Sequence, residues 1–150
     1  MNSNTNIAIT FEAQCCNSKQ PEIQWNWRDY HHKQTLFKTS TAEFDIDLDN
    51  GPHIIRFELI NKTNKDTTED QDLAVIIKNI AINGISDPKI LLASTYRPDY
   101  PEPWYSQQDP KPKPLLHGLS YLGWNGIWEL EFSVPEYQRL HKTLDLGQQY

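Results

Sequence analysis

Apolar and polar residues alternate along several short stretches of this chain, and each such stretch predicts a β-strand. The clearest stretch places its apolar or small residues on one parity: Trp124, Gly126, Trp128, Leu130, Phe132 and Val134. Weaker alternation marks residues 7–13, 23–27, 35–38, 44–48 and 54–60. A period of two is typical of a strand with one buried face, so these segments predict strands that cover a common core.

Two of these strands, 44–48 and 54–60, are predicted to form a hairpin around Asn50-Gly51-Pro52, which is a typical turn sequence. The outward face of the first strand then carries a row of acids: Glu43, Asp45, Asp47 and Asp49. Like charges at this spacing repel, so we expect a solvated face, with Arg56 on the neighbouring strand as a partial counter-charge. A cation site or a basic partner surface is the alternative.

Residues 73–82 form a strand of a different kind, because they are apolar on both parities. Leu73, Val75 and Ile77 share one parity, whereas Ile80 and Ile82 share the other. Two structures explain this pattern: a central strand covered on both faces, or a β-bulge near Lys78-Asn79 that switches the buried face.

The chain changes character between 86 and 118, where most of its ten prolines lie. Proline lacks a donor for a sheet, so we expect an extended arm that lies against another surface. After it, 119–135 supply a further sandwich strand. Residues 136–150 predict a short helix and tail, because Ser133 and Glu136 have capping-box spacing. The sequence therefore predicts one all-β domain, a jelly-roll-like β-sandwich of roughly eight strands, whose first part spans 1–85.

Charge and cysteine content narrow the function. The net charge of −6 disfavours binding to nucleic acid or to anionic membranes. No apolar stretch approaches the roughly 18 residues that predict a membrane span, and the first residues lack the pattern of a secretion signal. Cys15 and Cys16 are adjacent, a spacing that disfavours a mutual disulfide, so we expect free thiols and folding in a reducing compartment.

The polar loop from 61 to 72 is the candidate metal site. Its carboxylate and amide oxygens are the ligand type that calcium prefers, and the candidate ligands are Asn61, Asp66, Asp70 and Asp72. The spacing does not match an EF-hand, because no glycine stands at the required turn and no glutamate closes the loop. The alternative is a polar mobile loop without a ligand.

Tyr100, Trp104 and Tyr105, in the proline-rich arm, are the candidate binding residues. Exposed aromatic rings stack on sugars and also anchor protein interfaces, and a place on a long arm favours protein contact. Glu129 and Glu131 could form a carboxylate pair for glycoside cleavage, but a spacing of two is also that of any solvent-facing strand. With no nucleophile elbow or phosphate loop, the sequence predicts a protein that is not an enzyme.

Gly51-Pro52-His53, residues 57–61 and Ile80-Ala81-Ile82-Asn83-Gly84 resemble motifs of calcium-dependent xylan-binding carbohydrate-binding modules and their β-sandwich relatives. The resemblance covers roughly the first 85 residues. It implies a β-sandwich with a metal-binding loop, in which Asp72 lies nearest one ligating aspartate. The chain departs from the family at Asn61-Lys62, where the family commonly has Asn-Asp, and an ammonium group cannot ligate calcium.

Residues 119–137 resemble C-terminal stretches of small virion proteins from tailed bacteriophages, in particular cyanophages. The two resemblances imply a non-enzymatic structural or adhesive component of a virion, in the tail, baseplate or fibre region, that needs no cofactor. Its partners would be other virion proteins, in a homo- or hetero-oligomer, and a host-surface glycan, with assembly in the bacterial cytoplasm. The alternative is a calcium-dependent carbohydrate-binding protein that holds metal and ligand in the loop 61–72.

Overall fold

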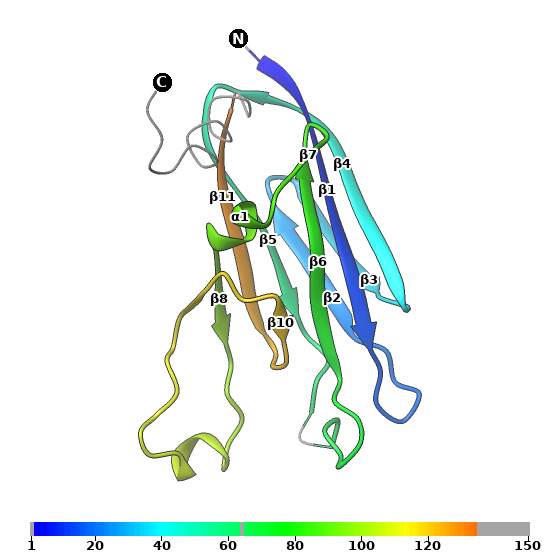
Figure 1. The fold of residues 1–150 in the computed structure, drawn as a ribbon, viewed down its shortest axis with the longest axis vertical. Helices are drawn as coiled ribbons and strands as arrows, with labels where there is room; N and C mark the ends of the chain where they lie inside the picture. The colour runs from blue at the N-terminus through cyan, green and yellow to red at the C-terminus, as the bar shows by residue number, and fades with distance from the viewer. Residues whose placement is uncertain (1, 64, 135–150) are drawn as a thin grey trace.

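The structure, a computed structural model that describes residues 2–63 and 65–134, is a β-sandwich of two antiparallel sheets (Figure 1). The first sheet, in the order β10-β6-β1-β4 with β7 beside β6, contains β1 (Asn2–Gln14), β4 (Thr39–Asp49), β6 (Ala74–Ile82), β7 (Ile85–Ser86) and β10 (Tyr121–Leu122). The second sheet contains, in spatial order, β3 (Tyr30–Thr35), β2 (Glu22–Trp27), β5 (Gly51–Leu59), β11 (Gly126–Val134), β8 (Ser94–Pro98) and β9 (Leu116–His117).

This architecture confirms the predicted all-β sandwich. The described residues include one short α-helix, α1 (Pro88–Leu92), and one 3-10 helix, η1 (Tyr105–Gln107). No helix in this part of the chain is long and apolar enough to cross a membrane. The helix predicted after residue 135 lies outside the described residues.

The core lies between the sheets and follows the alternation of the strands. Phe11 of β1 is fully buried and meets the second sheet through edge contacts to Trp25 and Phe57, at ring-centroid distances of 6.1 and 5.4 Å. Phe57 stacks in turn on Trp128 of β11 at 4.9 Å. Trp25, Trp27 and Trp128 are all buried, as the alternation predicts.

A β-bulge explains the unusual pattern of β6. In the pairing of β6 with β1, the register shifts between Thr10 and Phe11, which lie opposite Asn79 and Ile77, so Lys78 is the extra residue. The buried face therefore changes parity at this point, from Val75 and Ile77 to Ile80 and Ile82. Of the two predicted alternatives, the bulge is confirmed. The Asn83-Gly84 turn that follows has positive φ at both residues, as a type I′ turn of a two-residue hairpin requires.

The predicted hairpin of 44–48 with 54–60 is wrong. β4 pairs with β1 in the first sheet, whereas β5 pairs with β2 and β11 in the second, so the chain crosses between the two sheets at Asn50. The acidic row on β4 accordingly has other partners than predicted. Asn6 of β1 donates from Nδ2 to Asp45 at 2.8 Å and to Glu43 at 3.0 Å, and these amide donors offset the repulsion between the carboxylates.

Arg56, the predicted counter-charge, lies in the other sheet. Its Nε donates to Glu129 of β11 at 2.6 Å. The alternation therefore places these side chains on outward faces correctly, but it does not say which strands are neighbours. The cross-strand partner, not the face, decides which charges meet.

Both ends of the proline-rich segment belong to the sandwich. β8 pairs with β11, and β9 pairs with β8, so residues 99–115 form a loop whose two ends are held by the sheet. Gly126 allows the close approach of β8, because a Cβ at this position would collide with the backbone carbonyl of Arg97. Residues 99–115, here called the arm loop, therefore start and end at the second sheet.

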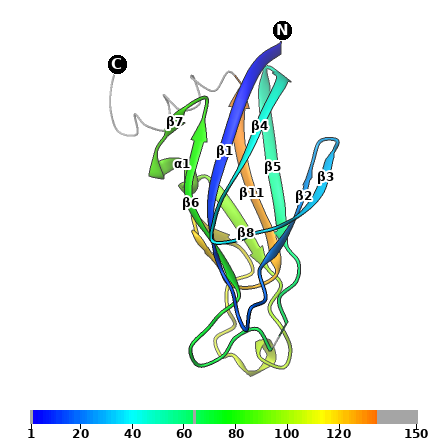
Figure 2. The same cartoon turned by 90° about the vertical axis from the view of Figure 1, so that its right-hand side faces the viewer.

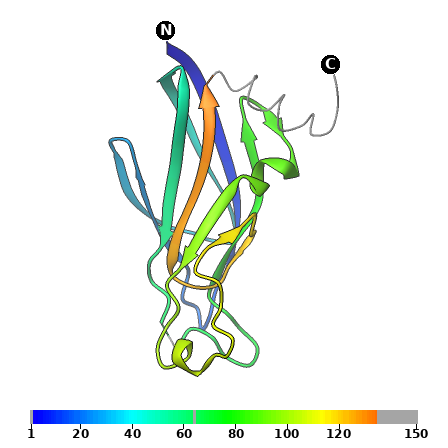
Figure 3. The same cartoon turned by 90° about the vertical axis from the view of Figure 1, so that its left-hand side faces the viewer.

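The two sheets are long and narrow, and the connections that build the site gather at one end. The β5–β6 loop, the arm loop and the β10–β11 turn all lie at the end opposite the start of β1 (Figure 1). The side views show these loops below the sheets, while the tip of the β2–β3 hairpin stands away from the body (Figures 2 and 3).

Candidate functional site

Four aromatic side chains meet at the loop end of the sandwich. Tyr100 is central: its ring lies 5.6 Å from Trp104, 5.8 Å from Tyr105 in a stacked geometry, and 6.4 Å from Trp124. Trp104 and Trp124 are 5.3 Å apart. All four rings are half-buried. The structure thus brings the three predicted aromatic residues together and ties the arm loop to the sandwich through Trp124.

Trp124 is the site residue that the sequence interpretation misplaced. It shares its parity with Trp128, and the alternation therefore placed it in the core. In the structure β11 begins only at Gly126, and Trp124 belongs to the turn from 123 to 125. The neighbouring glycines, Gly123 and Gly126, are the sequence signal that a turn interrupts the strand here.

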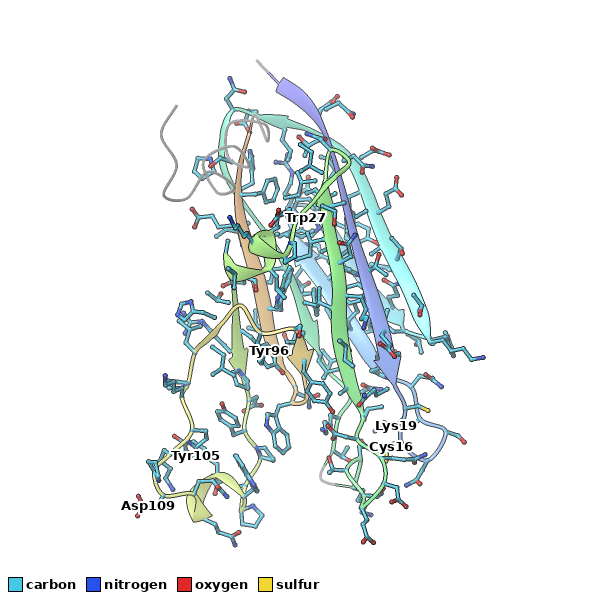
Figure 4. All side chains as sticks on the ribbon, in the orientation of Figure 1. Cys16, Lys19, Trp27, Tyr96, Tyr105 and Asp109 are labelled. Carbon is cyan, nitrogen blue, oxygen red and sulfur yellow. The ribbon has the colours of Figure 1, made fainter. Side chains whose placement is uncertain are left out.

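The arm loop is braced by its own side chains. Lys111 donates from Nζ to the carbonyls of Tyr105 and Ser106 at 2.9 and 2.8 Å, and it lies 5.3 Å from the centre of the Tyr105 ring. The Tyr100 hydroxyl donates to the carbonyl of Lys113 at 2.8 Å. Figure 4 shows Tyr105 on this loop, with Lys19 on the facing connection at the same end of the sandwich. These hydrogen bonds within the arm loop therefore hold the segment that carries the aromatic residues.

An open cleft of about 450 Å³ lies between the arm loop and the β5–β6 loop. This aromatic cleft is lined by Thr63, Thr67, Pro101, Glu102, Pro103, Trp104, Gln107 and Trp124. A second pocket of about 290 Å³ shares Thr67 and Trp124 with it and reaches toward Tyr96, Tyr121 and Asp72. Two indole rings beside hydroxyl and amide groups suit a ligand that has apolar faces and polar edges.

Lys62 forms the base of this region. Its side chain is 4% exposed, and its Nζ donates to Asp72 Oδ1 at 2.5 Å and to the carbonyl oxygen of Gly123. The same Nζ lies 4.8 Å from the centre of the Trp124 ring, within cation–π range. The backbone of Lys62 is held as well, by two hydrogen bonds to the side chain of Asn125 at 2.8 and 2.9 Å.

Asp72 is held by three donors from two segments, the β5–β6 loop and β10. Beside Lys62, Thr67 donates to Oδ1 at 2.6 Å and the Tyr121 hydroxyl donates to Oδ2 at 2.5 Å. Burial by itself raises the pKa of Asp72, but these hydrogen bonds and the charge of Lys62 outweigh it and hold the pKa below its ordinary value of 3.8. Burial, together with donation to the Asp72 carboxylate, raises the pKa of Tyr121. In this hydrogen bond Asp72 is therefore a carboxylate and Tyr121 is a neutral phenol.

The other candidate metal ligands do not share partners with Asp72. Asp66 accepts from Lys19 at 2.7 Å and from the backbone and hydroxyl of Thr63 at 2.7 and 3.0 Å. Asn61 accepts from the backbone of Glu22 and donates to the carbonyl of Gln20. Asp70 is exposed. Within the described residues, no three carboxylate, imidazole or thiol groups come close enough to hold a metal ion together.

Because Asp66 and Asp72 are ion-paired, we expect the folded protein to be less stable in acid. The pKa of Asp66, like that of Asp72, lies below 3.8, because hydrogen bonds and the charge of Lys19 outweigh its burial. A carboxyl with a lower pKa in the folded state stabilises the fold above the pKa of the unfolded chain, and this contribution is lost as pH falls through the folded value. We therefore expect the melting temperature to fall as pH drops below about 4.

Thermal unfolding of single variants between pH 7 and pH 3 checks this expectation. The fall in melting temperature should be smaller in Asp72→Asn, which removes one of the two carboxyls whose lowered pKa is described above. The exposed Asp70 in the same loop supplies the matched control, Asp70→Asn, which should keep the full pH dependence. Equal pH profiles for the two variants would contradict the role given to Asp72.

Comparison with known proteins finds a structural similarity but no sequence match. No family model and no curated protein matches the sequence. Among solved structures, the chain is similar to the selenomethionine form of vCBM60, from work on an evolutionary link by circular permutation between two families of calcium-dependent carbohydrate-binding modules. The match covers 84% of this chain and 89% of that chain, with 13% identity and a TM-score of 0.48. Similarity at this level carries no argument.

The protein is thus a two-sheet β-sandwich with an aromatic cleft built from loops at one end. Its fold rests on the strand pairing described above, and the case for a function rests on the cleft residues themselves.

Proposed function

We propose that this protein is a non-catalytic glycan-binding module whose ligand site is the aromatic cleft. The observation that carries the proposal is the pair of half-buried indoles, Trp104 and Trp124, which line one open cleft from two different segments. A pyranose ring has apolar C–H faces and hydroxyl edges. The indoles offer flat surfaces to the faces, and the Thr63, Thr67 and Gln107 side chains offer hydrogen-bonding groups to the edges.

The cleft favours binding over glycoside cleavage. The usual hydrolytic mechanism needs two carboxyl groups across the scissile bond. Of the described residues, Glu102 is the one carboxylate that lines the aromatic cleft. Glu129, one of the predicted carboxylate pair, is bound to Arg56, and neither Glu129 nor Glu131 lines either pocket.

A glycan array of the purified protein, followed by calorimetry on each glycan that binds, tests the proposal. We expect saturable binding to at least one neutral glycan and no release of reducing ends on prolonged incubation. Running the array in calcium and in chelator also tests the calcium-dependent alternative. Absence of binding in both conditions would refute the glycan-binding proposal, and release of reducing ends would refute the non-catalytic part.

A second proposal concerns where the module works. Residues 119–137 resemble virion proteins of tailed phages, and β3 is an edge strand with almost all its side chains exposed, which suits pairing with a neighbouring subunit. We propose a place in the tail, baseplate or fibre region, beside other virion proteins. Mass spectrometry of phage particles purified from bacteria that express the gene tests this; particles that lack its peptides would refute it.

A further inference from the structure

The second pocket, which adjoins the aromatic cleft at Thr67 and Trp124, holds the buried positive charge of Lys62. A buried ammonium group is costly unless it is paired and hydrogen-bonded. Lys62 meets this condition with the Asp72 carboxylate, the Gly123 carbonyl and the face of Trp124. These partners come from two segments, the β5–β6 loop and the turn between β10 and β11.

Both segments that Lys62 joins are walls of the cleft. The β5–β6 loop contributes Thr63 and Thr67, and the turn contributes Trp124. Lys62 neutralises Asp72, whose carboxylate in turn accepts from Thr67. One charge therefore fixes the indole on one side of the cleft and a hydroxyl group on the other.

The oxygens of the loop do not fit a resident calcium ion. Calcium takes six to eight oxygen ligands at about 2.3–2.6 Å. Here Asn61 is used to hold Glu22 and Gln20, and Asp66 is paired with Lys19. The position beside Asp72 Oδ1 is taken by the Lys62 ammonium.

We infer that Lys62 is a built-in cation beside this cleft, in the adjoining pocket, so that glycan binding needs no divalent metal and Lys62 acts as a positioning residue for Trp124 and the β5–β6 loop. The inference rests on the proposed function for its binding part. Its structural part stands without a ligand, because the tie between the two segments exists in the free protein.

The first experiment uses the unaltered protein. Melting temperature is measured in excess chelator and in millimolar calcium, and binding of the strongest array glycan is measured in the same two buffers. We expect equal melting temperatures and equal dissociation constants. A rise of several degrees in calcium, or binding that is lost in chelator, would overturn the inference. If no glycan binds at all, the proposed function fails, whereas the melting temperatures still decide whether calcium is part of the fold.

The second experiment replaces the charge. Lys62→Met keeps an unbranched apolar stem without the ammonium group, Lys62→Arg keeps a positive charge, and Lys65→Met is the matched control at an exposed lysine of the same loop. At a temperature where all variants are folded, Lys62→Met should weaken glycan binding by about tenfold or more. Lys62→Arg should retain most of the affinity, and Lys65→Met all of it.

Melting temperature should fall by several degrees in Lys62→Met but not in Lys65→Met. Equal affinities and equal melting temperatures for these two variants would overturn the role of the ammonium group. If Lys62→Met does not fold, the responses of the unaltered protein and of Lys62→Arg to calcium decide the inference, because a metal-dependent fold would respond in both.

Discussion

Truncation of Phe11 to alanine is expected to cost about 3–5 kcal/mol of unfolding free energy, the usual range for a buried phenylalanine. Phe11 is fully buried and joins the two sheets, because its ring contacts Trp25 and Phe57 of the opposite sheet. A cavity at this place would be lined by large aromatic groups that cannot close it by small shifts. Against a typical total of about 5–15 kcal/mol, the loss is a large fraction of the stability.

Urea and thermal unfolding measure this effect, and we expect the melting temperature to fall by roughly 10 °C. Phe37→Ala is the matched control, because Phe37 is 59% exposed on the connection between β3 and β4. That variant should stay within about 0.5 kcal/mol of the unaltered protein. A Phe11→Ala variant as stable as Phe37→Ala would contradict the assignment of Phe11 to the contact between the sheets.

The alternation of apolar and polar residues predicts which face of a strand is buried, but it does not predict which strands are neighbours. Trp25, Trp27 and Trp128 fall on the buried parity and are buried, and the change of parity in β6 marks a real bulge. Period two reports which side of a strand is covered, and that information is local. The identity of the strand beside β4 is not local information. That strand is β1, and its paired residues lie 27–47 positions from those of β4.

The sequence likewise indicates some residues of the candidate site and misses another. Tyr100, Trp104 and Tyr105 were identified because aromatic residues among prolines are hard to bury within their own segment. Trp124 was missed, because its parity matches that of a core residue and only the start of β11 at Gly126 separates the two. A residue between two glycines near a strand end deserves a turn assignment even when its parity fits the strand.

Lys62 shows what a resemblance conveys and what it leaves out. Its presence beside Asn61 argues from the sequence against a calcium ligand at that position. Two of its partners, Gly123 and Trp124, lie about sixty residues further along the chain, and the contact exists because the β10–β11 turn folds over the β5–β6 loop. The resemblance therefore draws attention to this loop, whereas the proposed role of the lysine comes from tertiary contacts.

Trp124 is expected to be the most sensitive position for binding, because it lines both pockets, contacts Trp104 and covers Lys62. If the proposed function holds, Trp124→Ala should weaken glycan binding by more than about thirtyfold, the equivalent of a loss above about 2 kcal/mol. Trp124→Phe keeps a flat ring in the cleft and should recover much of that loss. Calorimetry with the strongest array glycan measures both, with Phe37→Ala as the exposed aromatic control outside the two pockets. A Trp124→Ala variant that remains folded and binds as tightly as the Phe37→Ala variant would place the glycan elsewhere on the sandwich, because no ligand seated between Trp104 and this turn can lose the indole without losing affinity.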